Sequence, residues 1–127
     1  MNLSEYFENT EGTGILATAD STGNVDAAIY ARPHCIDEST VAFIMNEHLS
    51  YKNIISNPKA AYLFLEKGPG YRGKRLYLTK VRETADAELI ASMKRRTSGK
   101  CPVDEPEKHL VYFRVDKVRA LTGDEPG

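Results

Sequence analysis

The 127-residue sequence has no long apolar run, little cysteine and no excess of either charge. No segment approaches the roughly 18 apolar residues of a membrane-spanning helix, and the first residues lack the positive and apolar parts of a signal peptide. The two cysteines, Cys35 and Cys101, form no C-x-x-C pair, so reduced thiols are the simplest interpretation. We therefore expect a soluble cytoplasmic protein without membrane contact.

The charges nearly cancel, since 17 basic and 18 acidic side chains give a formal net charge of -1. General binders of nucleic acid usually carry a basic excess, so this balance argues against that class of protein. Hydrophobic residues make up 41% and charged residues 28% of the chain, which is typical of a globular rather than a disordered protein. At this length we expect a single domain over residues 1–127, with residues 122–127 as a frayed tail.

Several motifs of enzyme sites are missing as well. The glycine-rich segment at residues 68–73 matches neither G-x-G-x-x-G nor the phosphate-binding P-loop, and a plain connecting loop is its simplest interpretation. The chain has no G-x-S-x-G and no H-E-x-x-H, which argues against a serine hydrolase or a metallohydrolase. Its histidines and cysteines do not stand at the paired spacing of zinc ligands, so we expect no metal site.

Alternation of apolar residues predicts a chain dominated by strands. A polar turn around Gly23 separates the first two strands, and a second turn leads to a third, so the first half is expected to begin as a three-stranded meander. The fourth strand, residues 60–65, is nearly all apolar and is expected to be buried on both faces. Strands are expected at residues 15–19, 25–31, 41–45, 60–65, 76–81 and 110–118.

Two helices are predicted between the strands. Ser50 can cap one that ends at Asn57-Pro58, and Asp86 can cap one that continues to about Arg96. The connections between strands are too short for a doubly wound parallel sheet. The pattern predicts a mainly β (α+β) domain, a small barrel of six strands with short α insertions.

The segment from Met45 to Pro58 is the most informative for function, because it passes from a strand through a polar loop into a helix start. The first amides of a helix lack partners and carry partial positive charge, so a phosphate there could bind them, the Ser50 hydroxyl and the Lys52 ammonium. An ordinary serine cap beside a solvated lysine explains the same residues. Arg32, just before Pro33, is either a second phosphate ligand or a surface arginine at a strand end.

Two segments, residues 14–19 and 43–58, resemble the FMN-binding split-barrel proteins of the pyridoxamine 5'-phosphate oxidase-like superfamily. The second resembles the family pattern of a strand, a Ser/Thr-x-Lys and a short helix ending in Asn-Pro. The resemblance covers roughly residues 3–120. It implies a six-stranded split β-barrel with antiparallel strands and two or three short helices, FMN as the cofactor, and a homodimer with the flavin near the subunit interface.

The resemblance also implies roles for particular residues. Ser50 and Lys52 would hold the FMN phosphate, with Asn53 as a neighbouring contact. Met45 and Asn46 would approach the ring or the ribityl chain through their backbone, and the loop around Tyr71 could reach across to the partner. No catalytic residue is identified. The strand end that would flank the flavin comprises Ala31, Arg32, Pro33 and His34.

The expected function is that of a flavin-binding redox protein, either an oxidoreductase or an electron carrier. The chain resembles the compact members of the superfamily rather than the longer vitamin B6 oxidases. Two alternatives stay open at this point. The same scaffold could bind a deazaflavin or haem, with His109 or His48 as an axial donor. A non-enzymatic barrel resembling the OB-fold could instead bind single-stranded nucleic acid through its tyrosines, although the charge weighs against this.

Overall fold

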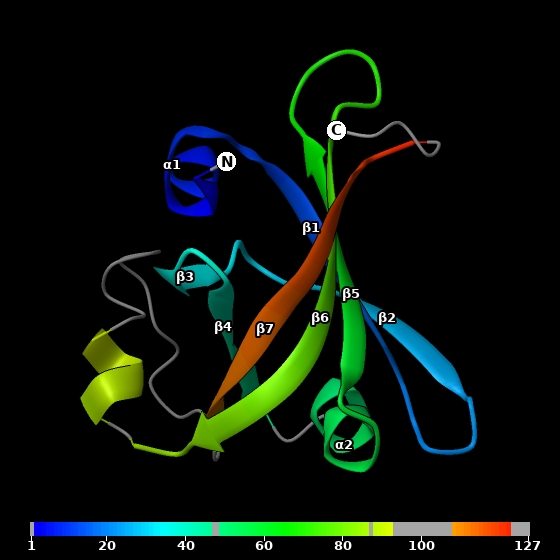
Figure 1. The fold of residues 1–127 in the computed structure, drawn as a ribbon, viewed down its shortest axis with the longest axis vertical. Helices are drawn as coiled ribbons and strands as arrows, with labels where there is room; N and C mark the ends of the chain where they lie inside the picture. The colour runs from blue at the N-terminus through cyan, green and yellow to red at the C-terminus, as the bar shows by residue number, and fades with distance from the viewer. Residues whose placement is uncertain (1, 47–48, 87, 93–107, 123–127) are drawn as a thin grey trace.

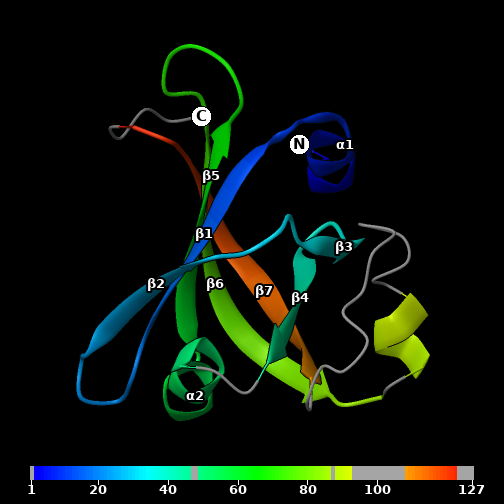
Figure 2. The same ribbon diagram turned by 180° about the vertical axis from the view of Figure 1, so that it is seen from behind.

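The computed structural model describes residues 2–46, 49–86, 88–92 and 108–122. They form a mainly antiparallel β fold with short helices (Figures 1 and 2). A further short helix spans residues 88–92. The other elements are α1 (Leu3–Asn9), β1 (Gly12–Ala19), β2 (Val25–Ile29), β3 (His34–Asp37), β4 (Thr40–Asn46), α2 (Leu49–Ser56), β5 (Lys59–Glu66), β6 (Gly73–Thr84) and β7 (Lys108–Ala120).

All seven strands belong to one sheet, in the order β2-β1-β5-β6-β7-β4-β3. The sequence predicted six strands and missed β3, which is four residues long and directly follows Pro33. Such a short edge strand shows too few alternations to be recognised by periodicity. Within the described residues no ladder joins β2 to β3, so the sheet has an edge at each of them.

The predicted meander of the first three strands is wrong. β2 pairs with β1 at one end of the sheet, whereas β4 pairs with β3 and β7 at the other end. After Ile29 the chain leaves the β1 ladder and crosses to the far side of the fold (Figure 2). The Tyr62 hydroxyl fixes this crossing by donating to the carbonyl oxygens of Tyr30 and Ala31, at 3.2 and 3.1 Å.

The predicted turn around Gly23 is confirmed. Gly23 has a φ of 94°, a conformation that costs glycine little. Asp20 holds the turn, since its Oδ1 accepts hydrogen bonds from the amides of Thr22 and Asn24 at 2.9 and 3.0 Å. These bonds hold the pKa of Asp20 well below its usual range, with the Asn24 side-chain bond contributing most.

The core lies on the inner face of the curved sheet, where every second strand residue packs against α1 and α2. Tyr62 and Phe64 of β5 are fully buried there, while Ala61, Leu63 and Leu65 on the opposite face are partly exposed. The prediction that this strand is buried on both faces is therefore wrong for the single chain. The largest fully buried side chains are Tyr62, Phe64, Phe113, Leu16, Met45, Ile54, Leu76, Leu78, Leu110, Val41 and Val111.

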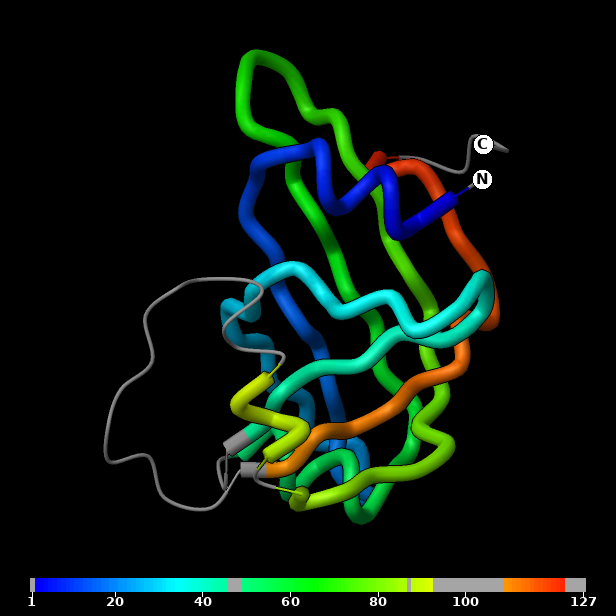
Figure 3. The backbone as a smooth tube through the Cα atoms, turned by 90° about the vertical axis from the view of Figure 1, so that its left-hand side faces the viewer, coloured from blue at the N-terminus to red at the C-terminus, as the bar shows by residue number. Residues whose placement is uncertain are grey.

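Helix α1 was not predicted from the sequence. Asn2 caps it by accepting a hydrogen bond from the Glu5 amide at 3.2 Å, and Leu3 and Phe7 are buried. The Phe7 ring lies edge-on to Phe64, with centroids 5.3 Å apart. Helix α1 therefore packs against one end of the inner face, which Figure 3 shows from the side.

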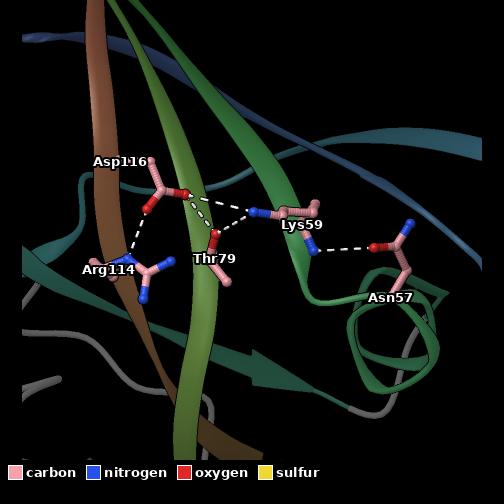
Figure 4. A network of polar contacts seen from close by, with 5 residues as sticks. All are labelled: Asn57, Lys59, Thr79, Arg114 and Asp116. Atoms are coloured by element: carbon pink, nitrogen blue, oxygen red, sulfur yellow. Dashed lines mark hydrogen bonds and ion pairs between the residues drawn. The ribbon is translucent and has the colours of Figure 1, made fainter.

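A polar network on the sheet ties β5, β6 and β7 together (Figure 4). Asp116 accepts hydrogen bonds from Arg114 Nε at 2.7 Å and from Thr79 Oγ1 at 2.5 Å, and Lys59 Nζ donates to the same Thr79 oxygen at 3.0 Å. The network lies where the β6–β7 register shifts at Tyr77 and Leu78. It therefore helps to fix the pairing of three strands next to an irregularity.

The last predicted elements are confirmed where the structure describes them. Asp86 Oδ1 accepts from the amides of Glu88 and Leu89 at 3.0 and 3.2 Å, as expected of a helix cap. The expected continuation of this helix through residues 93–96, the loop at 97–107 and the tail at 123–127 lie outside the described residues. The last strand is longer than predicted, since β7 spans Lys108–Ala120. In the described part of the chain, no helix has the length and apolar character needed to cross a membrane.

Candidate functional site

A pocket of about 410 Å³ lies where β2, β4 and the start of α2 meet. Figure 2 shows the ribbon of α2 below the crossing of the central strands. Apolar and polar side chains share its wall, so it can accommodate a ligand with both kinds of surface. The lining residues are Asp26, Ala28, Ile29, Tyr30, Ile44, Leu49 and Ser50.

The first turn of α2 is held in a fixed orientation by its buried side. Ile54 is 1% exposed, and Asn53 Nδ2 donates a buried hydrogen bond to Thr18 Oγ1 of β1 at 3.0 Å. Successive helical residues are about 100° apart around the axis, so residues on either side of Asn53 face other directions. As a result Ser50 is buried at the pocket while Lys52 is exposed.

Ser50 does not cap α2, because the helix begins at Leu49 and Ser50 belongs to its first turn. Its Oγ lies 3.4 Å from Asp26 Oδ2, which is long for a hydrogen bond between oxygens. The serine hydroxyl therefore lies inside the pocket, next to a carboxylate. Sequence reasoning missed Asp26, although a single acidic residue within the apolar β2 segment was a signal that could have been used.

Tyr30 is the second polar residue of the pocket that sequence reasoning missed. Burial raises the pKa of its hydroxyl above the ordinary value, and the nearby Asp26 carboxylate raises it further, while a hydrogen bond with Ser50 acts in the opposite direction. The tyrosine therefore keeps its proton at neutral pH. Asp26, Tyr30 and Ser50 together give the pocket one carboxylate and two hydroxyl groups.

Several predicted site residues lie on α2 or at the end of β4, next to the pocket, but they differ in exposure and in their hydrogen-bond partners. Lys52 is exposed on the same helical turn as Ser50. Asn53 faces β1 and its amide nitrogen is committed to Thr18. Met45 is fully buried in the core, and the backbone of Asn46 pairs with Lys108 at the end of β4.

The predicted residues of the strand end make their described contacts with α1, β4 and β5, the last through the hydrogen bond from Tyr62 to the Ala31 carbonyl oxygen. Arg32 Nη1 donates to the carbonyl oxygens of Phe7 and Thr10, at 2.6 and 2.9 Å, and so satisfies acceptors at the end of α1. Pro33 is buried, and His34 is in β3, paired with Ala42. Arg32 is therefore held at the end of α1, and His34 belongs to the β3–β4 ladder.

Tyr71 lies on the loop between β5 and β6 and is 78% exposed. Figure 1 shows this loop at the opposite end of the molecule from α2. Within one chain Tyr71 therefore does not reach the pocket. Its predicted contact with a partner subunit stays a prediction.

The histidine considered as an axial haem ligand, His109, does not line the pocket. Its ring stacks on Tyr51, with centroids 4.1 Å apart and planes inclined by 9°. The other candidate, His48, lies outside the described residues. Among the described residues, no group of three histidine, cysteine, aspartate or glutamate side chains is placed to hold a metal ion.

A second cavity, of about 490 Å³, lies at the other end of the fold between the start of α1 and the last part of β7. Leu3, Val115 and Val118 contribute apolar surface, and Lys74 and Glu38 contribute charge. It contains none of the predicted site residues. Of these two cavities, the pocket at α2 is the one lined by a residue that the sequence predicted for the site, Ser50.

Solved structures of other proteins share this fold. An FMN-binding protein from Syntrophomonas wolfei superposes with a TM-score of 0.79 at 17% identity, over 94% of this chain and 84% of that one. The chain has the fold of the FMN-binding split-barrel proteins. This confirms the fold that the resemblance in the sequence implied.

Two further structures with the split-barrel fold give the same result. A candidate pyridoxamine 5'-phosphate oxidase from Lactobacillus delbrueckii has a TM-score of 0.65 at 20% identity, covering 91% of this chain and 88% of that one. An F420 reductase has a TM-score of 0.68 at 19% identity, covering 90% and 94%. No protein-family model and no curated protein matches the sequence.

Proposed function

We propose that this chain is a flavin-binding redox protein, an oxidoreductase or an electron carrier, that holds FMN in the pocket at α2. One observation carries the proposal: within a split-barrel fold, the buried Ser50 hydroxyl lies in a pocket of about 410 Å³ at the first turn of a helix. Cofactor pockets usually have volumes of roughly 300 to 1,000 Å³ and combine apolar walls with a few polar groups.

The residues of the pocket fit the parts of FMN. Ile29, Ile44 and Leu49 offer apolar surface to the flavin ring, and Tyr30 offers a protonated hydroxyl to its polar edge or to the ribityl chain. The phosphate would be held by Ser50, Lys52 and the first backbone amides of α2. Arg32 is left out of this phosphate site, because its described contacts are with the end of α1.

Among the described lining residues, Asp26 opposes this assignment, since a carboxylate repels a phosphate dianion. Its position next to Ser50 makes the phosphate contact weaker than it would be beside a neutral side chain. Asp26 also favours ligands that can donate hydrogen bonds, such as the hydroxyls of a ribityl chain.

Bound FMN would supply the hydride or electron transfer. The chain's own residues would bind the cofactor, orient it against Ile29 and Ile44, and limit its exposure to water. The proposal assigns no catalytic acid or base among the pocket residues: Tyr30 keeps its proton at neutral pH, and Asp26 lies beside the Ser50 hydroxyl. The chain would thus contribute by positioning the cofactor and by the electrostatic field that its residues create around the cofactor.

The test is to purify the protein, record its visible spectrum and identify any released molecule by mass. The apoprotein is then titrated with FMN and with riboflavin. Lys52→Ala should weaken FMN binding by about 1.5 to 3 kcal/mol, the range for a hydrogen bond to a charged group, and leave riboflavin binding unchanged. The matched control is Lys67→Ala, which removes an exposed lysine whose described ion pair is with Glu11.

The other possible outcomes lead to different conclusions. Equal FMN affinity for wild type and Lys52→Ala would show that Lys52 does not hold the phosphate. A released deazaflavin would assign the site to that class of cofactor, which the likeness to an F420 reductase makes the second candidate. A colourless protein without affinity for FMN would contradict the proposed function.

We also propose that the chain forms a homodimer through an outer apolar face. This face consists of the outward side chains of three adjacent strands, which the register places on one side of the sheet. Val25 and Ile29 are 82% and 76% exposed, so nothing in the described chain covers its β2 edge. The outer apolar face comprises Ile15, Ala17, Val25, Ala27, Ile29, Ala61, Leu63 and Leu65.

A contiguous apolar surface of this kind usually marks an interaction site. Because Ile29 belongs both to this face and to the pocket, a partner that covered the face would also border the pocket. Val25→Lys should convert the dimer to a monomer in sedimentation measurements without lowering the melting temperature of the monomer. Val81→Lys, at a valine 48% exposed on β6, is the control. A Val25→Lys protein that stays dimeric would show that another surface is used.

A further inference from the structure

Behind the first turn of α2 lies a cluster of four titratable side chains that the pocket does not use. Tyr51 of α2 is 7% exposed and donates its hydroxyl hydrogen to Glu83 Oε2 of β6 at 2.5 Å. Lys80 Nζ lies 2.6 Å from the other carboxylate oxygen, and His109 Nδ1 of β7 lies 3.5 Å from Oε2. The Tyr51 ring also stacks on the His109 ring.

Glu83 is the centre of this cluster and stays ionised. Burial works to raise its pKa, but the ion pair with Lys80, the hydrogen bond from Tyr51 and the electrostatic influence of His109 together outweigh it and hold the pKa below the ordinary value. A charged acceptor forms a shorter and stronger hydrogen bond than a neutral one. Glu83 therefore holds Tyr51 firmly, and with it one side of the first turn of α2.

The position of Tyr51 in the chain links this cluster to the pocket. Tyr51 stands between Ser50, which faces the pocket, and Lys52, which is exposed. Because a helix turns by about 100° per residue, fixing Tyr51 against β6 and β7 also fixes the directions of its two neighbours. Asn53 adds a second anchor on β1, so the turn is held from two sides.

We propose, on the basis of the FMN site proposed above, that Tyr51 is a positioning residue for the phosphate-binding turn of α2, held in place by Glu83. It does not touch the cofactor. It sets the rotation of the turn, so that the Ser50 hydroxyl, the Lys52 ammonium and the first amides point at one phosphate. The cluster thereby contributes to selectivity for FMN over riboflavin.

The chain offers a closely matched control for this role. Tyr6 of α1 donates its hydroxyl hydrogen to Glu66 Oε2 at 2.6 Å, which is the same kind of bond on another helix. Tyr6 packs on Phe7 and Phe64, on the α1 side of the core. Tyr6→Phe and Tyr51→Phe thus delete equivalent hydrogen bonds, but only Tyr51 adjoins the proposed phosphate ligands.

The experiment measures melting temperature and the dissociation constants of FMN and riboflavin for wild type, Tyr51→Phe and Tyr6→Phe. Both variants should lose similar thermal stability. Tyr51→Phe should weaken FMN binding about fivefold, because charge-assisted hydrogen bonds depend on geometry. Riboflavin binding should stay within about twofold, and Tyr6→Phe should keep the wild-type ratio of the two constants.

An unchanged ratio of FMN to riboflavin affinity in Tyr51→Phe would overturn the proposal and leave Tyr51 a purely structural role. If Tyr51→Phe does not fold, Glu83→Gln keeps the size of the acceptor but removes its charge, and the same ratio decides. Failure of the proposed function looks different: wild type itself would then bind FMN no more tightly than riboflavin, and Lys52→Ala would change neither constant.

Discussion

Removing the charge of Asp26 is the most direct test of where the phosphate lies. Asp26 is half-buried on β2, and its Oδ2 lies 3.4 Å from Ser50 Oγ. Asp26→Asn keeps the size of the side chain and its ability to accept a hydrogen bond from Ser50. The substitution therefore changes the electrostatic field of the pocket with little change in its shape.

The expected magnitude follows from the distance to a phosphate bound at Ser50. A phosphate oxygen that accepts from Ser50 Oγ would place the phosphorus about 6 Å from the Asp26 carboxylate. At the dielectric constant of water, charges of -1 and about -1.5 to -2 at that distance repel each other by about 1.0 to 1.4 kcal/mol. Asp26→Asn should therefore tighten FMN binding about five- to tenfold.

The assay is fluorescence titration of the apoprotein with FMN and riboflavin at low and high salt. Only FMN binding should tighten, and the gain should shrink at high salt because exposed charges are screened. Glu38→Gln, which removes an exposed carboxylate on the β3–β4 turn, is the control and should change neither constant. Equal weakening of both ligands by Asp26→Asn would refute the reasoning, since it would show that Asp26 binds the flavin or ribityl part.

Two further predictions concern the scaffold. A Cβ at Gly14 would overlap the Tyr62 hydroxyl and lie 2.7 Å from the Tyr30 carbonyl oxygen, so Gly14→Ala should cost about 1 to 3 kcal/mol in urea denaturation. The cost should be smaller in a Tyr62→Leu background, which removes both the overlapping hydroxyl and the ring carbon that bears it, and an equal cost would contradict the proposed overlap. Burial raises the pKa of the Cys35 thiol to about 11 from 9.0, with a smaller contribution from the Glu8 carboxylate. Only the thiolate reacts with an alkylating reagent, and a raised pKa leaves less thiolate at pH 8. In a Cys101→Ser variant, alkylation of Cys35 at pH 8 should therefore be about a hundredfold slower than that of free cysteine. A rate like that of free cysteine would show an accessible thiol and contradict the raised pKa.

Local features of the fold could be predicted from the sequence because each depends on neighbouring residues. The Gly23 turn is stabilised by Asp20 and Asn24 within five positions, and α2 ends where Asn57-Pro58 stops it. Pairing between distant strands could not be predicted in this way. Nothing local indicates that β4 pairs with β7 rather than β2, because that choice depends on long-range packing.

The candidate site was predicted only in part, for the same reason. Ser50 and Lys52 follow each other closely, so their shared helical turn could be read from the sequence. Asp26 meets Ser50 across 24 positions, and Arg32 meets Phe7 across 25, so neither contact has a sequence signature. The structure thus adds an acidic neighbour to the pocket and places Arg32 elsewhere.

The position of β7 between β6 and β4 has a consequence for the order in which the chain can fold. The ladder partners Met45 and His109 are about sixty positions apart. During translation at roughly 5 to 20 residues per second, β4 would wait about 3 to 12 seconds for its second neighbour. The nascent β3–β4 hairpin therefore emerges from the ribosome with one edge of β4 unpaired, and an unpaired strand edge can pair with another chain.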